Sequence, residues 1–191
     1  MYKFTGFTES ANNALNYSVE AAENMGHTYI GSEHLLLGLL SDMKMVSATI
    51  LNMKKVTLKR AEEQIKSIVG IGLPTNLTPN DITPRCKRII ENALAIGRSK
   101  ALRDTGTEEL LDALTREFDC AGCKVLNSLG VHPGDLFSTG KTMYEDEKKN
   151  KVLKTNLKKC CLILLDQFPN ELFHSNCQVL KYHRSKDFFP P

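Results

Sequence analysis

The stretch Gly31-Ser-Glu-His-Leu-Leu-Leu-Gly-Leu-Leu40 returns 75 positions later, in changed form, as Gly106-Thr-Glu-Glu-Leu-Leu-Asp-Ala-Leu114. Sliding the sequence against itself by that offset aligns residues 7–56 with 82–131 without a gap. The shared residues fall mostly at apolar and capping positions, which indicates a duplicated structural unit. The identical pairs are Thr8/Thr83, Gly31/Gly106, Glu33/Glu108, Leu35/Leu110, Leu36/Leu111, Leu39/Leu114, Leu51/Leu126, Asn52/Asn127 and Val56/Val131.

Each copy has the apolar spacing of helices. Small and apolar residues recur at three- and four-residue steps between positions 11 and 25, and Leu35, Leu36 and Leu39 form a second stripe. Shorter helices are predicted at about 45–53 and 57–69. Their counterparts are predicted at about 120–128 and from near 132 to about 137. No stretch alternates long enough to predict a strand. The sequence therefore predicts an all-α fold of two pseudo-symmetric four-helix repeats.

Hydroxyl side chains mark the expected helix starts. Thr8 and Thr83 precede the first helix of each copy and suit N-caps, whose hydroxyl accepts a backbone N–H of the first turn. Pro84 follows at the first helical position, where a missing N–H does no harm. Ser32 is expected to cap the second helix, after Gly31 ends the connection.

Four motifs connect the repeat to a known family. Phe7-Thr-Glu9 matches an opening F-T-E, and residues 26–40 are close to G-H-x-Y-[IV]-G-T-E-H-[IL]-L-L-G-L. In the second copy, residues 83–87 match T-P-R-A-K and residues 126–131 match L-x-x-L-G-V. These are motifs of the Clp amino-terminal repeat domain, found at the front of ClpC- and ClpA-type AAA+ unfoldases, and the chain resembles that domain over residues 4–137.

The resemblance implies a recognition module that is not an enzyme. In the family this domain receives protein substrates and adaptor proteins, and the ATP-driven unfolding belongs to AAA+ modules that follow it. We expect residues 1–137 to hold both repeats (about 4–70 and 80–137), with no catalytic residue and no cofactor. The alternative is a stand-alone or truncated protein that joins a Clp ATPase hexamer and regulates it without binding substrate itself.

For the ClpC branch, the resemblance implies a phospho-arginine site in each repeat. The family's site residues correspond to Thr8 with Glu33 and to Thr83 with Glu108. A carboxylate binds a guanidinium by two charge-assisted hydrogen bonds, and a phosphate favours the N–H groups at a helix start. The structural alternative is that the threonines are caps and the glutamates favour the helix dipole. Glu109 replaces the family's histidine, and its carboxylate would repel a phosphate at the second site.

Cys120-Ala-Gly-Cys123 has the spacing of a zinc or redox pair. A zinc site would need two further ligands, and a thioredoxin-like pair would need a βαβ unit, which the sequence does not predict. We expect instead reduced thiols that pack between helices, and no metal. The candidates for further zinc ligands are Cys160, Cys161, His174 and Cys177.

Charge and hydropathy exclude other partners. Residues 1–137 carry 15 Lys and Arg against 16 Asp and Glu, which leaves no basic surface for nucleic acid. The longest apolar run, residues 160–165, is too short to cross a bilayer, and the first residues lack the apolar stretch of a secretory signal. We therefore expect a cytoplasmic protein that binds neither nucleic acid nor membrane.

The last third of the sequence departs from the family. Gly140-Lys-Thr142 resembles the end of a P-loop, but Asp135 stands where the first glycine of that loop is needed. Nucleotide binding is therefore not expected. Residues 138–150 are predicted to be a polar linker, and residues 151–191 form a tail of unknown structure.

Overall fold

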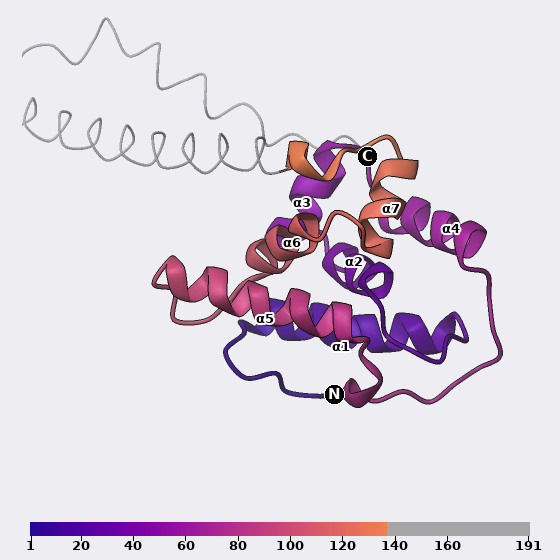
Figure 1. The fold of residues 1–191 in the computed structure, drawn as a ribbon, viewed down its shortest axis with the longest axis horizontal. Helices are drawn as coiled ribbons and strands as arrows, with labels where there is room; N and C mark the ends of the chain where they lie inside the picture. Colours follow the sequence, from indigo (N-terminus) through magenta and orange to yellow (C-terminus); the bar gives the residue numbers. More distant parts are fainter. Residues whose placement is uncertain (137–191) are drawn as a thin grey trace, which may run out of the picture. The chain divides into compact units, whose positions relative to one another are not determined.

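The computed structural model describes residues 1–136, and within that range the chain is all helical, as predicted (Figure 1). A helical turn over residues 133–136 stands where the last helix of the second copy is expected. The predicted boundary at 137, the linker over 138–150, the tail over 151–191 and the Gly140–Thr142 stretch lie outside the described residues. The elements are α1 (Glu9–Asn24), α2 (Ser32–Leu40), α3 (Val46–Met53), α4 (Leu58–Ile68), the 3-10 helix η1 (Pro79–Asp81), α5 (Pro84–Ser99), α6 (Thr107–Arg116) and α7 (Ala121–Ser128).

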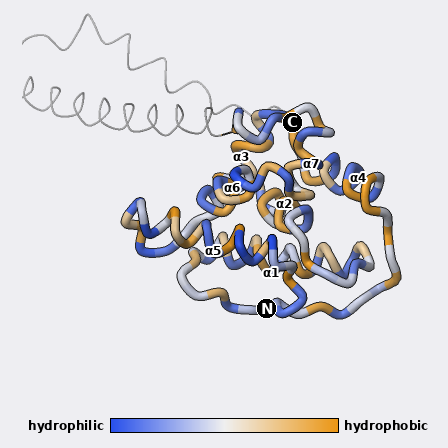
Figure 2. The backbone as a smooth tube through the Cα atoms, viewed as in Figure 1, coloured by the Kyte–Doolittle hydropathy of each residue, from blue (hydrophilic) through white to orange (hydrophobic). Residues whose placement is uncertain are grey.

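Helix α2 is the centre of the core. All nine of its residues are buried, and it contacts each of the other six named α-helices in the described chain. Its five leucines are at most 3% exposed, and its stretch of the tube is coloured mainly as hydrophobic (Figure 2). A helix that is apolar all round is stable only when other elements cover it on every side. The leucine-rich stretch over residues 31–40 therefore forms the centre around which the other helices pack.

Helices α1 and α2 pack closely because Gly38 has no side chain. A Cβ at this position would overlap the Ala14 carbonyl of α1 and lie 2.5 Å from the Ser18 hydroxyl. The Ser18 hydroxyl itself donates to the Ala14 carbonyl at 2.8 Å, which satisfies it inside the contact. The equivalent residue of the second copy is Ala113, so the α5–α6 contact accommodates a methyl group.

The two repeats exchange backbone hydrogen bonds through two short parallel bridges, Phe7 with Thr105 and Ile30 with Ile82. The bridges are related by the same 75-residue offset as the sequence. In each one, the segment before the first helix of one repeat pairs with the segment before the second helix of the other. The bonds are Thr105 N to Gly6 O (2.8 Å), Thr8 N to Thr105 O (3.0 Å), Ile30 N to Asp81 O (2.9 Å) and Thr83 N to Ile30 O (3.0 Å).

The connection between the repeats runs along the end of α1. The Gly72 amide donates to the Met25 carbonyl at 2.8 Å, and the Leu77 amide donates to the Glu23 carboxylate at 2.7 Å. Gly26 has a φ of 68° and touches the backbone of Gly72, so a side chain there would be both strained and obstructed. Among residues 1–136, no helix is long and apolar enough to span a bilayer.

Candidate functional site

Thr8 and Thr83 are N-caps, as predicted. The Thr8 hydroxyl accepts the Ala11 amide and the Thr83 hydroxyl accepts the Cys86 amide, each at 3.3 Å. Both side chains are half-buried. The structural role that the sequence predicts for these hydroxyls is therefore confirmed, and their backbone amides are used in the bridges between the repeats.

Each threonine faces the glutamate helix of the other repeat. Thr83 is bonded to Ile30, just before the helix that carries Glu33, and Thr8 is bonded to Thr105, just before the helix that carries Glu108. The sequence analysis places Thr8 with Glu33 and Thr83 with Glu108, whereas these backbone bonds join Thr83 to the Glu33 segment and Thr8 to the Glu108 segment. The 75-residue spacing reveals the repeat, but it does not show which threonine lies near which glutamate.

A cysteine thiol gives independent evidence for the first of these pairings. Cys86 lies in the first turn of α5 and is almost fully buried. Burial raises the pKa of its thiol to about 12, and the nearby Glu33 carboxylate adds to the rise. The Glu33 carboxylate is therefore close to the start of α5, the helix that Thr83 caps.

Glu33 is a buried carboxylate, with 3% of the residue exposed. It folds back over Gly31, where an added Cβ would lie 2.5 Å from both carboxylate oxygens. Burial raises the pKa of Glu33, while its own backbone amide, nearby His27 and the hydroxyls of Tyr29 and Ser32 oppose the rise. These backbone, imidazole and hydroxyl groups thus favour the ionised form of the carboxylate, against the effect of its burial.

Two histidines next to Glu33 form a chain of hydrogen bonds. The Gly31 amide donates to His34 Nδ1 at 3.0 Å, so the proton of neutral His34 must be on Nε2. That Nε2 lies 2.7 Å from His27 Nδ1, and His27 Nε2 lies 3.2 Å from the Gly70 carbonyl. His34 is fully buried, and both of its ring nitrogens have a hydrogen-bond partner.

The N-cap of α2 is Gly31, so the prediction that Ser32 caps this helix is wrong. The imidazole of His34 accepts the Gly31 amide instead. Ser32 is the first helical residue, and its hydroxyl accepts the amide of Gly122 in α7 at 3.0 Å. The Ser32 hydroxyl therefore bonds to a residue 90 positions away in the sequence, and not to the backbone of its own helix as a cap would.

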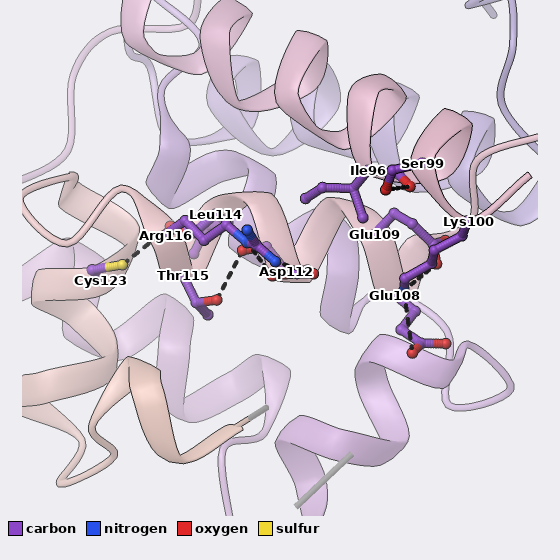
Figure 3. A network of polar contacts seen from close by, with 10 residues as sticks. All are labelled: Ile96, Ser99, Lys100, Glu108, Glu109, Asp112, Leu114, Thr115, Arg116 and Cys123. Atoms are coloured by element: carbon purple, nitrogen blue, oxygen red, sulfur yellow. Dashed lines mark hydrogen bonds and ion pairs between the residues drawn. The ribbon is translucent and has the colours of Figure 1, made fainter. Parts of the chain in front are cut away.

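The Glu108 carboxylate has a cation beside it. Lys100 Nζ lies 3.9 Å from Glu108 Oε1 and 2.9 Å from Glu109 Oε1 (Figure 3). Partial burial raises the pKa of Glu108, and Lys100 opposes that rise. The sequence analysis did not single out Lys100. The one available signal was the 75-residue offset, which pairs Lys100 with the apolar Met25.

Glu109 takes over the capping role that His34 has in the first repeat. Its Oε2 accepts the Gly106 amide at 3.0 Å, and its Oε1 accepts Lys100. Glu109 is buried. The sequence analysis expects this carboxylate to repel a phosphate at the second site; in the structure it is turned to the Gly106 amide and to Lys100.

Cys120 and Cys123 are both buried at the start of α7. Cys120 accepts the Cys123 amide at 3.4 Å, and the Cys123 thiol donates to the Leu114 carbonyl at 3.3 Å. Hydrogen bonding from Cys123 lowers the pKa of the Cys120 thiol. No group of three metal-binding side chains occurs among the described residues, and the other candidate ligands lie outside them.

The fold and the two bridges define a helical double-repeat domain. In it, the segment before the first helix of each repeat bonds to the segment before the second helix of the other repeat. The chain belongs to the family of the Clp repeat (R) N-terminal domain, whose model matches residues 6–129. The family predicted from the four motifs is thereby confirmed.

The similar proteins are Clp chaperones and Clp protease subunits. An ATP-dependent Clp protease ATP-binding subunit ClpA homolog of Trieres chinensis is 35% identical over 151 residues, which are 79% of this chain. The chloroplastic chaperone protein ClpC1 of Oryza sativa subsp. japonica is 33% identical over 133 residues, or 70% of this chain. The chain spans only 17% and 14% of the length of these two relatives.

Solved structures show the same fold. The N-terminal domain of the chaperone ClpD from Arabidopsis thaliana superposes with a TM-score of 0.61 at 24% identity, covering 74% of this chain and 99% of that domain. The N-terminal domain of the ClpV1 ATPase from E. coli has a TM-score of 0.55 at 15% identity, covering 70% of this chain and 82% of that one. The matched part of these proteins is their amino-terminal domain.

Proposed function

We propose that residues 1–137 receive protein substrates or adaptor proteins for a Clp-type ATPase, and that the Thr83–Glu33 site binds phosphorylated arginine on those proteins. The domain acts by recognition and has no catalytic role of its own. The observation that carries the proposal is the hydrogen bond from the Thr83 amide to the Ile30 carbonyl, because it joins the start of α5 to the segment that leads to the Glu33 carboxylate.

The charges at this site suit a phosphorylated guanidinium. The start of α5 has no acidic residue in its first turn and carries Arg85, Lys87 and Arg88. A helix N-terminus and cations together favour a phosphate dianion. Glu33 supplies the carboxylate that a guanidinium needs for a bidentate contact. Arg85 and Arg88 are also paired with carboxylates, Asp119 and Glu117, each at 3.6 Å. A phosphate that binds here therefore competes with those two ion pairs.

Access to Glu33 depends on Tyr29. The neighbouring Tyr29 hydroxyl favours the ionised form of Glu33 and so acts to lower its pKa, and the tyrosine is partly exposed. A guanidinium that reaches Glu33 replaces the Tyr29 hydroxyl as donor. Because the replacement donor is charged, the exchange gains a stronger hydrogen bond than it loses.

Isothermal titration of the full chain with phospho-arginine tests the proposal. We expect saturable binding by the unaltered protein and at least tenfold weaker binding by Glu33→Ala, since a charge-assisted contact is worth about 1.5–3 kcal/mol. Glu63→Ala is the matched control, because Glu63 is an exposed glutamate on α4. Free arginine and inorganic phosphate serve as competing ligands and are expected to bind far more weakly.

Two results would count against the proposal. Equal affinity of the unaltered protein and Glu33→Ala would remove Glu33 from the site. Absence of phospho-arginine binding by the unaltered protein would overturn the assignment of the ligand.

The burial of Glu33 favours a second candidate function. A carboxylate that is already satisfied inside the fold suits a protein that joins a Clp ATPase hexamer and regulates it without holding substrate. Co-purification of this chain with a full-length Clp ATPase, together with failure of phosphorylated peptides to bind the chain alone, would support this alternative. Peptide binding by the isolated chain that Glu33→Ala abolishes would exclude it.

A further inference from the structure

The two repeats differ at two positions that touch the candidate site residues. Met25 and His34 of the first repeat correspond to Lys100 and Glu109 of the second. In the first repeat, a neutral imidazole caps the glycine before α2. In the second, a carboxylate caps the glycine before α6 and pairs with the lysine at 2.9 Å. The two differences depend on each other, because the buried carboxylate of Glu109 is stabilised by the ammonium group of Lys100.

Lys100 also engages the carboxylate of the second site. Its Nζ lies 3.9 Å from Glu108 Oε1. Partial burial lowers the pKa of Lys100, but the hydrogen bond to Glu109 and the charges of Glu109, Glu108 and Asp112 outweigh it and leave the pKa raised. The ammonium group is thus a permanent cation at the position where a ligand guanidinium would approach Glu108.

The helix start at the second site also has the opposite charge. The first turn of α1 contains the acidic residue Glu9, whereas the first turn of α5 contains none. Helix α5 instead carries Arg85, Lys87 and Arg88 within its first five residues. A phosphate dianion at Thr8 would meet a carboxylate, whereas one at Thr83 would meet three cations, two of which (Arg85 and Arg88) are paired with Asp119 and Glu117.

We infer that Lys100 occupies the carboxylate of the Thr8–Glu108 site from within the chain, so that this protein binds one phosphorylated arginine, at Thr83–Glu33, rather than two. The inference rests on the proposed function. It identifies Lys100 as the residue that sets the number of sites. The two repeats are then unequal, although residues 7–56 and 82–131 align without a gap. Glu108 then serves to hold Lys100 and not a ligand.

The test is the stoichiometry of phospho-arginine binding, measured by titration calorimetry and by native mass spectrometry of the full chain. We expect one equivalent for the unaltered protein, one for Glu108→Ala, and loss of binding for Glu33→Ala. Lys100→Arg keeps the ion pair and is the control that stays at one equivalent. Lys100→Met alone would leave Glu109 buried without a cation, so it is combined with Glu109→His, which restores both residues of the first repeat.

The double variant Lys100→Met/Glu109→His is expected to bind a second equivalent, at least tenfold more weakly than the first because Glu9 remains. A thermal melt confirms that the variant is folded. Two equivalents in the unaltered protein, with one lost in Glu108→Ala, would overturn the inference and leave the proposed function standing. A double variant that stays at one equivalent would overturn it as well. No binding by the unaltered protein would overturn both.

Discussion

The imidazole of His34 is buried without charge because both of its nitrogens already have partners. Nδ1 accepts the Gly31 amide, and Nε2 bonds to His27. A further proton on Nδ1 would point at an N–H group and would have no water to stabilise it. Burial, and next to it the charge of His27, therefore lowers the pKa of His34 from 6.5 to about 3.

This lowered pKa predicts a loss of stability in mild acid. Between pH 6.5 and about 3, the unfolded chain binds a proton at His34 that the folded chain does not, so the free energy of unfolding falls as the pH falls. The loss is about 1.4 kcal/mol per pH unit within that window. Urea unfolding at pH 7.5 and 5.5 should show a drop larger by roughly 1 kcal/mol in the unaltered protein than in His34→Gln.

His132→Gln is the control for this measurement, because His132 is exposed. Its pH dependence should match that of the unaltered protein. An equal drop in His34→Gln and the unaltered protein would show that His34 is not the group responsible.

Residue identities alone predict some of these local roles and miss others. Thr8 and Thr83 could be recognised as caps because a cap depends on a threonine and the three residues after it. Ser32 was assigned to a cap for the same reason, but its hydroxyl bonds to Gly122. Lys100 was missed because its partners come from the next helix, and their approach depends on how two helices pack.

At the scale of the element, Gly38 sets the distance between α1 and α2. Repeat-related helices α5 and α6 have Ala113 at this position. The periodic leucines predict that α2 is a buried helix, but the pattern does not say which glycine is there for packing and which is there for a turn. The structure separates them, since Gly38 is helical and Gly70 has a φ of 90° in open space.

Gly38→Ala is expected to destabilise the protein by about 2 kcal/mol or more, although alanine is the better helix former. The methyl group would overlap the Ala14 carbonyl, and only movement of α1 away from α2 relieves the overlap. Thermal or urea unfolding measures the change. Gly134→Ala is the control, because the nearest atom to its added Cβ is a side-chain nitrogen of His132 at 3.3 Å and the residue is exposed.

A change of less than 0.5 kcal/mol in Gly38→Ala would show that α1 can shift without loss, and that the close contact is not required. The control is expected within that range, as for most surface substitutions.

At the scale of the whole molecule, the bridges make the two repeats dependent on each other. The start of α1 is bonded to the second repeat, and the start of α5 is bonded to the first. Helix α2 contacts helices of both repeats, and the two copies fall within one compact unit. The helices could be predicted because their apolar periodicity is a local property of the sequence. The duplication could be predicted because the two copies can be aligned directly. The sequence could not predict that the start of each first helix bonds to the other repeat. Both copies carry the same apolar positions, so the pattern does not distinguish contacts within a copy from contacts between copies.

Residues 1–136 are therefore expected to unfold as one cooperative unit. Leu51→Ala and Leu126→Ala are matched variants, since the two leucines are equivalent and both are fully buried. Each should lower the free energy of unfolding by about 2–5 kcal/mol. Hydrogen exchange followed by mass spectrometry of peptides should show that either variant lowers protection in α2 and in α6 alike. Loss of protection confined to the altered repeat would contradict this expectation.

The paired bridges at Thr105 and Ile30 have the geometry of a self-complementary dimer interface, in which the same patch is used twice. Here the two partners are halves of one polypeptide, joined by residues 70–80, so their association does not depend on protein concentration. Because the two halves are parts of one polypeptide, their sequences need not be identical, and a substitution in one half does not alter the other. A lysine at position 100 and a methionine at position 25 are a difference that a symmetric dimer of identical chains could not hold.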